Sequence, residues 1–181
     1  MVDDRETAMT PPALRLVQGS LADGSGWSWF CGQCAARPNH DSVSPLARVC
    51  PSCGMGLLLE TRSDAAPDHA EAFLVVDSRL TVQALSHRAE RLLGVSEEDV
   101  IDRPVDRFLG GAEAENRDPV DLMAVLHAAS TRSDEISSLL VRPRRAFGVR
   151  VHARIAPCGP PRAALIVLGD RPPRRRDLRI V

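Results

Sequence analysis

Two short cysteine pairs constrain this chain of 181 residues more than any other feature. Two residues separate Cys31 from Cys34, and after a spacer of fifteen residues the same spacing recurs at Cys50 and Cys53. Two cysteines three positions apart on a tight turn can direct both sulfurs at one ion, and two such pairs are typical of a tetrahedral zinc site. Because four thiolates leave no open coordination position, we expect this zinc to be structural rather than catalytic.

The segment around the cysteines is expected to depend on the metal for its folding. A segment of about 40 residues cannot bury enough apolar surface to fold alone, so metal binding would supply much of its folding free energy. Gly32 and Gly54 are expected to allow close backbone approach and positive φ angles in the turns. Unliganded structural cysteines, a redox dithiol and iron in a rubredoxin-like site remain alternatives, and His40 in the spacer is interpreted as a loop histidine.

These features resemble a zinc ribbon, in which two cysteine turns sit on β-hairpins. The resemblance covers residues 24–62. Trp27, Trp29 and Phe30 precede the first turn with the alternation of a strand. We interpret them as packing the small core of the ribbon or its contact with the rest of the chain. Trp27 and Trp29 are also candidates for binding a protein partner, because exposed aromatic residues anchor interfaces.

Composition points to a globular protein of the cytoplasm. Apolar residues make up 44% of the chain, which is enough to form a core. No run approaches the roughly 18–20 apolar residues that a membrane span needs. The first residues, MVDDRETAMT, are acidic and lack the apolar region of a signal peptide. In the cytoplasm, paired cysteines more often bind metal or do redox chemistry than form disulfides.

Charge is distributed unevenly along the chain. All 23 basic residues are Arg. Residues 1–141 carry 12 Arg against 22 acidic residues, a net charge of −10, whereas residues 142–181 carry 11 Arg against 2 Asp, a net charge of +9. Such a split indicates either an internal charge match or a basic docking surface.

The chain divides into five expected segments. They are a flexible arm at 1–23, the ribbon at 24–62, a linker at 63–70, a larger domain at 71–170 and a basic tail at 171–181. Strands are expected at 71–77 and 80–85, followed by a helix that Ser86 caps and Gly94 ends. A turn capped by Ser96 and a short helix from Pro104 come next.

A longer helix is expected to begin at Asp118-Pro119, with Pro119 in its first position. Its inner face is expected to be lined by the following residues: Val120, Met123, Ala124 and His127, with Leu122 and Leu126 beside them. Three strands close the domain: 136–141, an alternating strand at 147–155, and an apolar and therefore central strand at 163–168, with Cys158 in the turn before it.

This order of elements resembles a PAS domain. The residues that carry the resemblance are FLVVDSRLTVQALSHRAERLLGVSEEDVIDRPVDRFL at 73–109 and the three closing strands. The resemblance implies an α+β fold with a five-stranded antiparallel sheet in the order 2-1-5-4-3 and helices on one face. It also implies a sensor or a protein–protein interaction module.

The same resemblance raises the question of a cofactor, because PAS relatives bind haem, flavin or small metabolites between sheet and helices. Covalent flavin photochemistry needs a cysteine on the short helix, and the corresponding run, VDRFL at 105–109, has none. His127 on the longer helix is a candidate haem ligand. A non-covalent small ligand and a filled core remain open.

The sequence contains no phosphate loop, kinase or cyclase motif, or nucleophile elbow, so we expect a non-enzymatic regulatory protein that signals through protein contacts. Arg150 and Arg154, on the polar side of the alternating strand, are candidates for contacting an acidic partner. The alternatives are a zinc-ribbon regulator that contacts nucleic acid through its basic tail, and a PAS sensor that binds haem or a small ligand.

Overall fold

The protein is described here by a computed structural model, which covers residues 26–38, 48–112, 120–146 and 148–169. The expected arm at 1–23, His40 and the tail at 171–181 lie outside the described residues. The ribbon segment contains β1 (Trp27–Cys31) and β2 (Leu58–Arg62). The rest of the described chain forms β3 (Ala72–Val76), β4 (Val82–Leu85), α1 (His87–Leu93), α2 (Glu97–Val100), the 3-10 helix η2 (Val105–Arg107), β5 (Leu109–Gly111), α3 (Leu122–Thr131), β6 (Ser137–Pro143), β7 (Val151–Gly159) and β8 (Ala163–Gly169).

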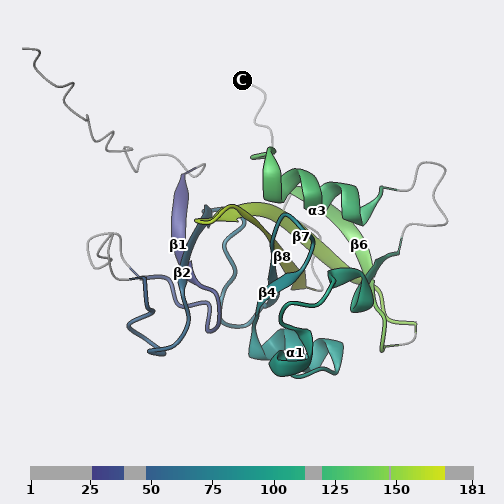
Figure 1. The fold of residues 1–181 in the computed structure, drawn as a ribbon, viewed down its shortest axis with the longest axis horizontal. Helices are drawn as coiled ribbons and strands as arrows, with labels where there is room; N and C mark the ends of the chain where they lie inside the picture. Colours follow the sequence, from purple (N-terminus) through teal and green to yellow (C-terminus); the bar gives the residue numbers. More distant parts are fainter. Residues whose placement is uncertain (1–25, 39–47, 113–119, 147, 170–181) are drawn as a thin grey trace, which may run out of the picture.

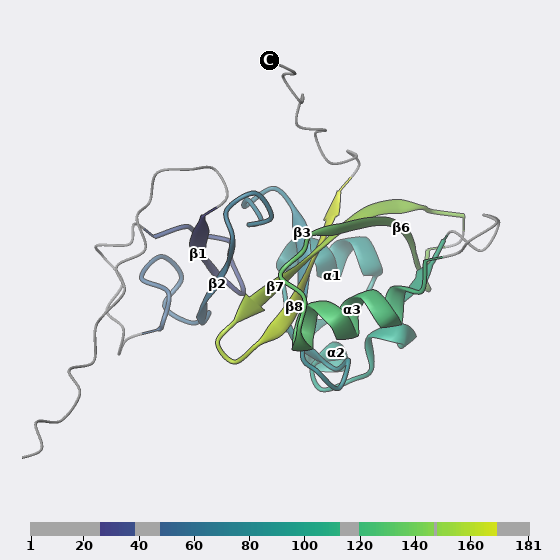
Figure 2. The ribbon, with the colours of Figure 1, turned by 90° about the horizontal axis from the view of Figure 1, so that it is seen from above.

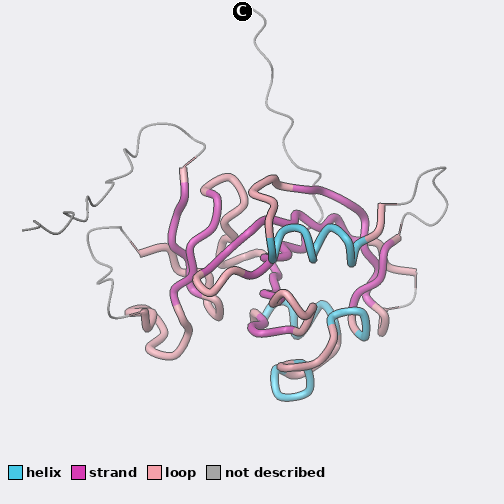
Figure 3. Tube along the Cα trace, turned by 45° about the horizontal axis from the view of Figure 1, so that its top comes forward, coloured by secondary structure: helices cyan, strands magenta, loops and turns pink. Residues whose placement is uncertain are grey.

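The strands of the larger segment pair in the expected order. β8 pairs with β3 on one side and with β7 on the other, β4 pairs with β3, and β6 pairs with β7, all antiparallel. The segment also contains β5, which the sequence did not predict and which pairs with β6. If this three-residue strand is left out of the count, the order β4-β3-β8-β7-β6 is the 2-1-5-4-3 order that the PAS resemblance implies. The central position of β8 is therefore confirmed. The expectation of five strands was too low, because β5 and the two ribbon strands bring the sheet in the described part of the chain to eight. Figure 3 shows the strands of this curled sheet beside the helices.

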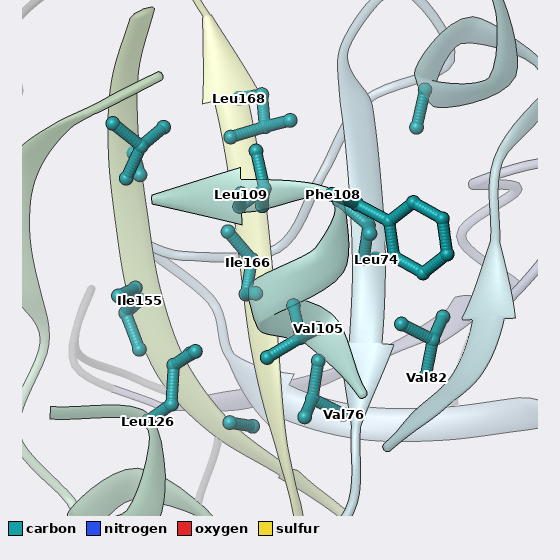
Figure 4. Packing of buried hydrophobic residues seen from close by; sticks show 14 of the residues in the cluster. Leu74, Val76, Val82, Val105, Phe108, Leu109, Leu126, Ile155, Ile166 and Leu168 are labelled. Atoms are coloured by element: carbon teal, nitrogen blue, oxygen red, sulfur yellow. The ribbon is translucent and has the colours of Figure 1, made fainter. Parts of the chain in front are cut away.

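The sheet is covered on both faces. Because side chains alternate along a strand, Leu74 and Val76 of β3 face the helices, whereas Phe73 and Val75 point to the opposite face. The cluster between sheet and helices, called the helix-side core here, includes ten residues labelled in Figure 4: Leu74, Val76, Val82, Val105, Phe108, Leu109, Leu126, Ile155, Ile166 and Leu168. Figure 2 shows α1 and α3 on one side of β7 and β8 and the paired strands β1 and β2 on the other. In Figure 1, β1 and β2 lie at the left, with α3 above and α1 below the strands.

The helix after Ser86 forms as expected. Ser86 is its N-cap, with Oγ accepting from Ala89 N at 3.2 Å, and Gly94 ends it in the left-handed region at φ 64°. The same Oγ accepts from Phe73 N at 2.9 Å, so this buried hydroxyl also ties the helix to β3. Glu90 does not close a capping box on its own helix; it accepts from Glu97 N at 2.8 Å, at the start of α2. No helix in the described part of the chain is long and apolar enough to cross a membrane.

The expectation for the longer helix was wrong in its start and its inner face. Asp121 caps α3, with Oδ1 accepting from Met123 N at 2.9 Å, and α3 begins at Leu122. Its buried residues are Leu122, Leu126, Ala129 and Ser130, whereas Val120, Ala124 and His127 are exposed. Leu122, Leu126 and Ala129 are spaced by four and three positions, which is about one helical turn, so they form a single apolar stripe that faces the sheet.

The alternating strand also differs from its expected limits. β7 begins at Val151, and Val149 is 40% exposed, while Phe147 lies outside the described residues. At its other end β7 continues through Cys158, which is therefore in a strand and not in a turn. The strand is extended by pairing on both edges: β8 pairs with β7 as far as Cys158, which lies opposite Ala163, and Thr61 and Glu60 of β2 lie opposite Cys158 and Gly159. β6 and β2 thus occupy successive stretches of one edge of β7.

Two neighbouring residues of α3 provide a test of this packing. Leu126 is fully buried and His127 is exposed. Leu126→Ala is expected to lower the free energy of unfolding by about 2–5 kcal/mol, because it leaves a cavity in the helix-side core. His127→Ala, the control, should change it by less than about 0.5 kcal/mol. Urea denaturation of both variants measures the difference, and equal destabilisation would contradict the orientation of α3.

Candidate metal centre

The four cysteines of the ribbon meet at one point. The sulfurs of Cys31, Cys34, Cys50 and Cys53 all lie within 4.8 Å of one another. The Cys31 Sγ to Cys53 Sγ distance is 3.7 Å, and the Cys34 Sγ to Cys50 Sγ distance is 3.8 Å. Sulfurs around a tetrahedral ion with Zn–S bonds of about 2.3 Å would be about 3.8 Å apart. The four cysteines therefore fit a single metal ion, and all are free thiols rather than disulfides.

The two cysteine turns present their backbone to the sulfurs in the same way. In the first turn, the N–H groups of Gln33 and Cys34 donate to Cys31 Sγ at 3.4 and 3.5 Å. In the second, Ser52 N donates to Cys50 Sγ at 3.4 Å. Such donors stabilise thiolates, because a hydrogen bond to the charged form of a group favours that form.

The positive φ angle occurs at the residue that follows each cysteine pair, and not at Gly32, which lies inside the first pair. Gly54 has φ 69° and Ala35 has φ 59°, and each N–H closes its turn by donating to the carbonyl of the first cysteine, at 2.9 and 3.1 Å. The expectation is thus confirmed for Gly54, but Gly32 does not have a positive φ. In the first turn a non-glycine residue takes the left-handed conformation.

The protonation equilibria of the cysteines differ with their surroundings. Burial raises the pKa of Cys31 and of Cys34, since an isolated thiolate is poorly solvated there. Backbone N–H groups of Gly56 and Met55 lower the pKa of Cys53 to about 6. A bound cation would offset the desolvation of the first two thiolates, because metal ligation requires the deprotonated form.

Gly56 is a site residue that the sequence did not single out. Its N–H donates to Cys53 Sγ at 3.3 Å, and its carbonyl accepts from Cys50 N at 2.8 Å. A Cβ at this position would overlap Cys31 Sγ. The position of Gly56 after the second cysteine pair matches no known motif, so the sequence offered no reason to select it. The reason appears only in the fold, where Cys31 of the first turn occupies the space that a side chain would need.

The cysteines themselves form most of the interior of the ribbon. The cluster around them consists of Cys31, Cys50 and Leu58, with Trp29, Cys34, Ala36 and Cys53 packed against it. Trp29 thus packs against the metal site, whereas Trp27 is 39% exposed. Three further exposed apolar residues lie on the second turn, namely Val49, Met55 and Leu57, with Val49 and Leu57 paired across its hairpin.

The other side of the ribbon lies on the sheet. Phe30 is fully buried, and its ring meets that of Phe73 edge-on, with centroids 5.9 Å apart and an interplanar angle of 84°. The cluster at this contact, called the ribbon-side core here, consists of the following residues: Phe30, Ala35, Leu59, Phe73, Val75, Cys158, Ala163, Leu165 and Val167. Its members come from both the ribbon and the larger segment.

Polar contacts also join the ribbon to its surroundings. Thr61 Oγ1 donates to Pro157 O at 2.7 Å, and Arg48 donates to Pro160 O at 3.0 Å. Arg37 donates to the carbonyl groups of Ala66 and Pro67, within the segment expected to be a linker. These two residues are buried, which shows that this stretch packs against its neighbours.

The remaining candidate residues lie away from the cysteines. Arg154 forms an ion pair with Glu71, with 3.2 Å between Nη2 and Oε2, and Arg150 is exposed. His127 is on the exposed side of α3, so its placement does not support haem ligation inside the fold. The buried polar side chains among the described residues are Thr61, Ser86 and Ser130, and the helix-side core is otherwise apolar.

Comparison with known proteins gives structural similarity without sequence similarity. The sequence matches no protein-family model, and no curated protein matches it. Among solved structures, the PAS domain of nitrogen regulation protein NR(II) from Vibrio parahaemolyticus is 14% identical, with a TM-score of 0.42 over 56% of this chain and 89% of that chain. The PAS domain of an HTR-like protein from Haloarcula marismortui is 18% identical, with a TM-score of 0.42 over 56% and 82%.

The contact of Gly56 with Cys31 predicts a specific loss of metal affinity. Gly56→Ala should weaken zinc binding by roughly 10- to 100-fold, because the methyl group must displace a ligand sulfur or its neighbours. Gly32→Ala is the matched control, since a Cβ there would meet its nearest neighbours at 3.5 Å, an ordinary contact. Competition with a chromophoric zinc chelator measures both affinities. Equal affinities for the two variants would contradict the assigned role of Gly56.

Proposed function

We propose that this chain is a non-enzymatic regulatory protein in which a PAS-type sensor or interaction domain is coupled to a structural zinc ribbon and acts through protein contacts in the cytoplasm. The observation that carries the proposal is the arrangement around the sheet. The strand order and one-sided helices are those expected of a PAS domain, and the ribbon covers the other face of the sheet with Phe30, Ala35 and Leu59.

Zinc is the proposed ion because of the ligands and their geometry. Four sulfur ligands favour zinc or iron, and the sulfur separations fit a tetrahedral site. With all four positions filled by protein, the ion would have no place for a substrate or water. It would fix the ribbon rather than take part in a reaction.

Several surface arginines of the basic part of the chain contact acceptors of the same chain. Within the basic part of the chain, Arg154 pairs with Glu71 and Arg162 pairs with Asp134 at 2.8 Å. Arg144 and Arg145 donate to the carbonyl groups of Asp106 and Gly94 at 3.2 and 3.1 Å. Two of these arginines are thus paired with carboxylates of the same chain, which supports the proposed internal charge match, while the other two donate to uncharged backbone carbonyls.

Trp27 and Arg150 remain proposed partner-contacting residues, and Trp29 contributes mainly by packing on the cysteines. Arg154 would contact a partner only by exchanging its ion pair with Glu71 for one with the partner. A small ligand bound between the sheet and the helices is an alternative role for the domain. It would meet the apolar residues of the helix-side core, which favour an apolar ligand over a charged one.

Replacement of one cysteine should release the metal. Cys50→Ser is expected to lose the single bound zinc ion and to unfold the ribbon, because the serine hydroxyl is a poor replacement for a thiolate. The helix-side core should remain folded. Cys158→Ala is the control, because Cys158 is outside the cluster. Elemental analysis gives the metal content and distinguishes zinc from iron; unchanged zinc in Cys50→Ser would refute this ligand set.

The proposed mode of action can be tested on the full chain. Light scattering over a range of concentrations should show reversible self-association or, with a candidate protein partner, a mixed complex. Titration with duplex DNA and single-stranded RNA should show no tight binding at physiological salt, where non-specific contacts are weak. Micromolar nucleic-acid binding, lost when Arg174, Arg175 and Arg176 are changed to Ala, would favour the nucleic-acid alternative instead.

A further inference from the structure

The residues that cover the sheet are chain neighbours of the metal ligands. Phe30 directly precedes Cys31, and Ala35 directly follows Cys34. Both belong to the ribbon-side core, with exposed fractions of 0% and 3%. Because successive side chains of a strand point to opposite faces, β1 directs Cys31 at the other sulfurs and Phe30 at the sheet. The same short stretch of backbone therefore positions both a metal ligand and a side chain that covers the sheet.

Apart from the pairing of β1 with β2 over five positions, the interior of the ribbon is built mainly from these cysteines. Its own cluster consists mainly of the ligands, with Leu58 as the fully buried aliphatic side chain. Without an ion, four thiols cannot replace the metal–sulfur bonds. Loss of the ion would thus release the backbone that positions Phe30 and Ala35.

The rest of the fold does not depend on the ribbon in the same way. The helix-side core contains no residue before Ala72. β2 joins the sheet through only two residue pairs, Glu60 with Gly159 and Thr61 with Cys158. By contrast, β3 and β8 pair over five positions, and β7 and β8 over seven. The ribbon is therefore attached mainly by the side chains of the ribbon-side core and by the hydrogen bonds of Thr61 and Arg48, contacts that require the ribbon to keep its own shape.

We propose that metal binding by the four cysteines holds the ribbon closed over the outer face of the sheet, and that loss of the ion uncovers this face while the helix-side core stays folded. This inference rests on the proposed function, because it requires the cysteines to bind zinc. Release of the ribbon would expose Phe73, Val75, Leu165 and Val167. An apolar surface that the ribbon now covers would then face the solvent. Zinc availability would then control which surface of the protein a partner can reach.

Cys158 is a natural reporter of this cover. It is the fifth of the five cysteines and lies outside the metal cluster. It is 3% exposed in the ribbon-side core, opposite Thr61 of β2 and Ala163 of β8. Burial also raises its pKa to about 12, so both access and ionisation make this thiol unreactive while the ribbon is docked.

The test is alkylation of the full chain with N-ethylmaleimide, followed by mass spectrometry of the peptide that contains Cys158. In the zinc-loaded chain Cys158 should be protected. After zinc removal with a chelator under reducing conditions, and in Cys50→Ser, its labelling should become faster by about tenfold or more. Hydrogen exchange of the backbone amides paired between β3 and β8 should stay slow in all of these samples.

A pair of ribbon variants with all four ligands retained separates the cover from the metal. Phe30→Ala removes the ring that packs on Phe73 and should speed Cys158 labelling in the zinc-loaded chain. Leu57→Ala, in which the changed residue is 60% exposed and outside the ribbon-side core, should not. Labelling is compared at equal zinc content, so that a change in metal affinity is not read as a change in the cover.

The possible results differ in what they refute. Zinc uptake with equal Cys158 protection in the loaded and metal-free chains overturns the inference and leaves the proposed zinc site intact. Simultaneous loss of amide protection in β3 and β8 also overturns it, because the whole fold would then be opening. A chain that takes up no zinc refutes both the zinc site and the inference, and metal analysis identifies this case before any labelling.

Discussion

The alternation of side chains along β1 is the constraint on which the arrangement of the two parts depends. One residue step separates the ring of Phe30, buried on the sheet, from the sulfur of Cys31, which faces the other cysteines. A strand cannot change this relation without rotating both side chains together. The register of β1 on β2, with Phe30 opposite Leu59 and Cys31 opposite Leu58, then places a second apolar residue on the sheet and another in the ribbon.

This arrangement explains the composition of the central strands. All five residues of β3 are buried, and so are the first six of β8. Strands covered on one face alternate apolar and polar residues, whereas strands covered on both faces are apolar throughout. The helices cover one face of β3 and β8, and the ribbon covers the other. The polar side chains of the sheet, such as His152 and Arg154, lie farther along β7, away from this contact.

The sequence predicted those features that local patterns determine. The cysteine spacing predicted the cluster of four sulfurs, and the alternating and apolar runs, together with the PAS resemblance, predicted the strand order. Ser86 and Gly94 marked the ends of α1. The start of α3 was misplaced because Asp118-Pro119 and Asp121 offer similar capping chemistry, and only packing against the sheet selects Leu122 and Leu126 as the inward side.

The docking of the ribbon could not be predicted from local patterns, because it joins residues far apart in the chain. Neither the aromatic pair Phe30 and Phe73 nor the pairing of β2 with the end of β7 has a signature within a few residues. The fully apolar run at 163–168 was interpreted only as a central strand. One layer of helices would leave every other side chain of this strand exposed, so a fully apolar run also indicates that the second face of the strand is covered.

The hydrogen bond from Thr61 to Pro157 spans 96 positions of the chain. During synthesis the ribbon therefore leaves the ribosome well before β7 and β8, the strands on which it rests, have been made. Domains generally fold as units in the order of their synthesis, and a cysteine cluster can bind its ion as soon as its own residues are free. The ribbon would thus be complete before β7 and β8 are made, so these two strands would form against a preassembled template.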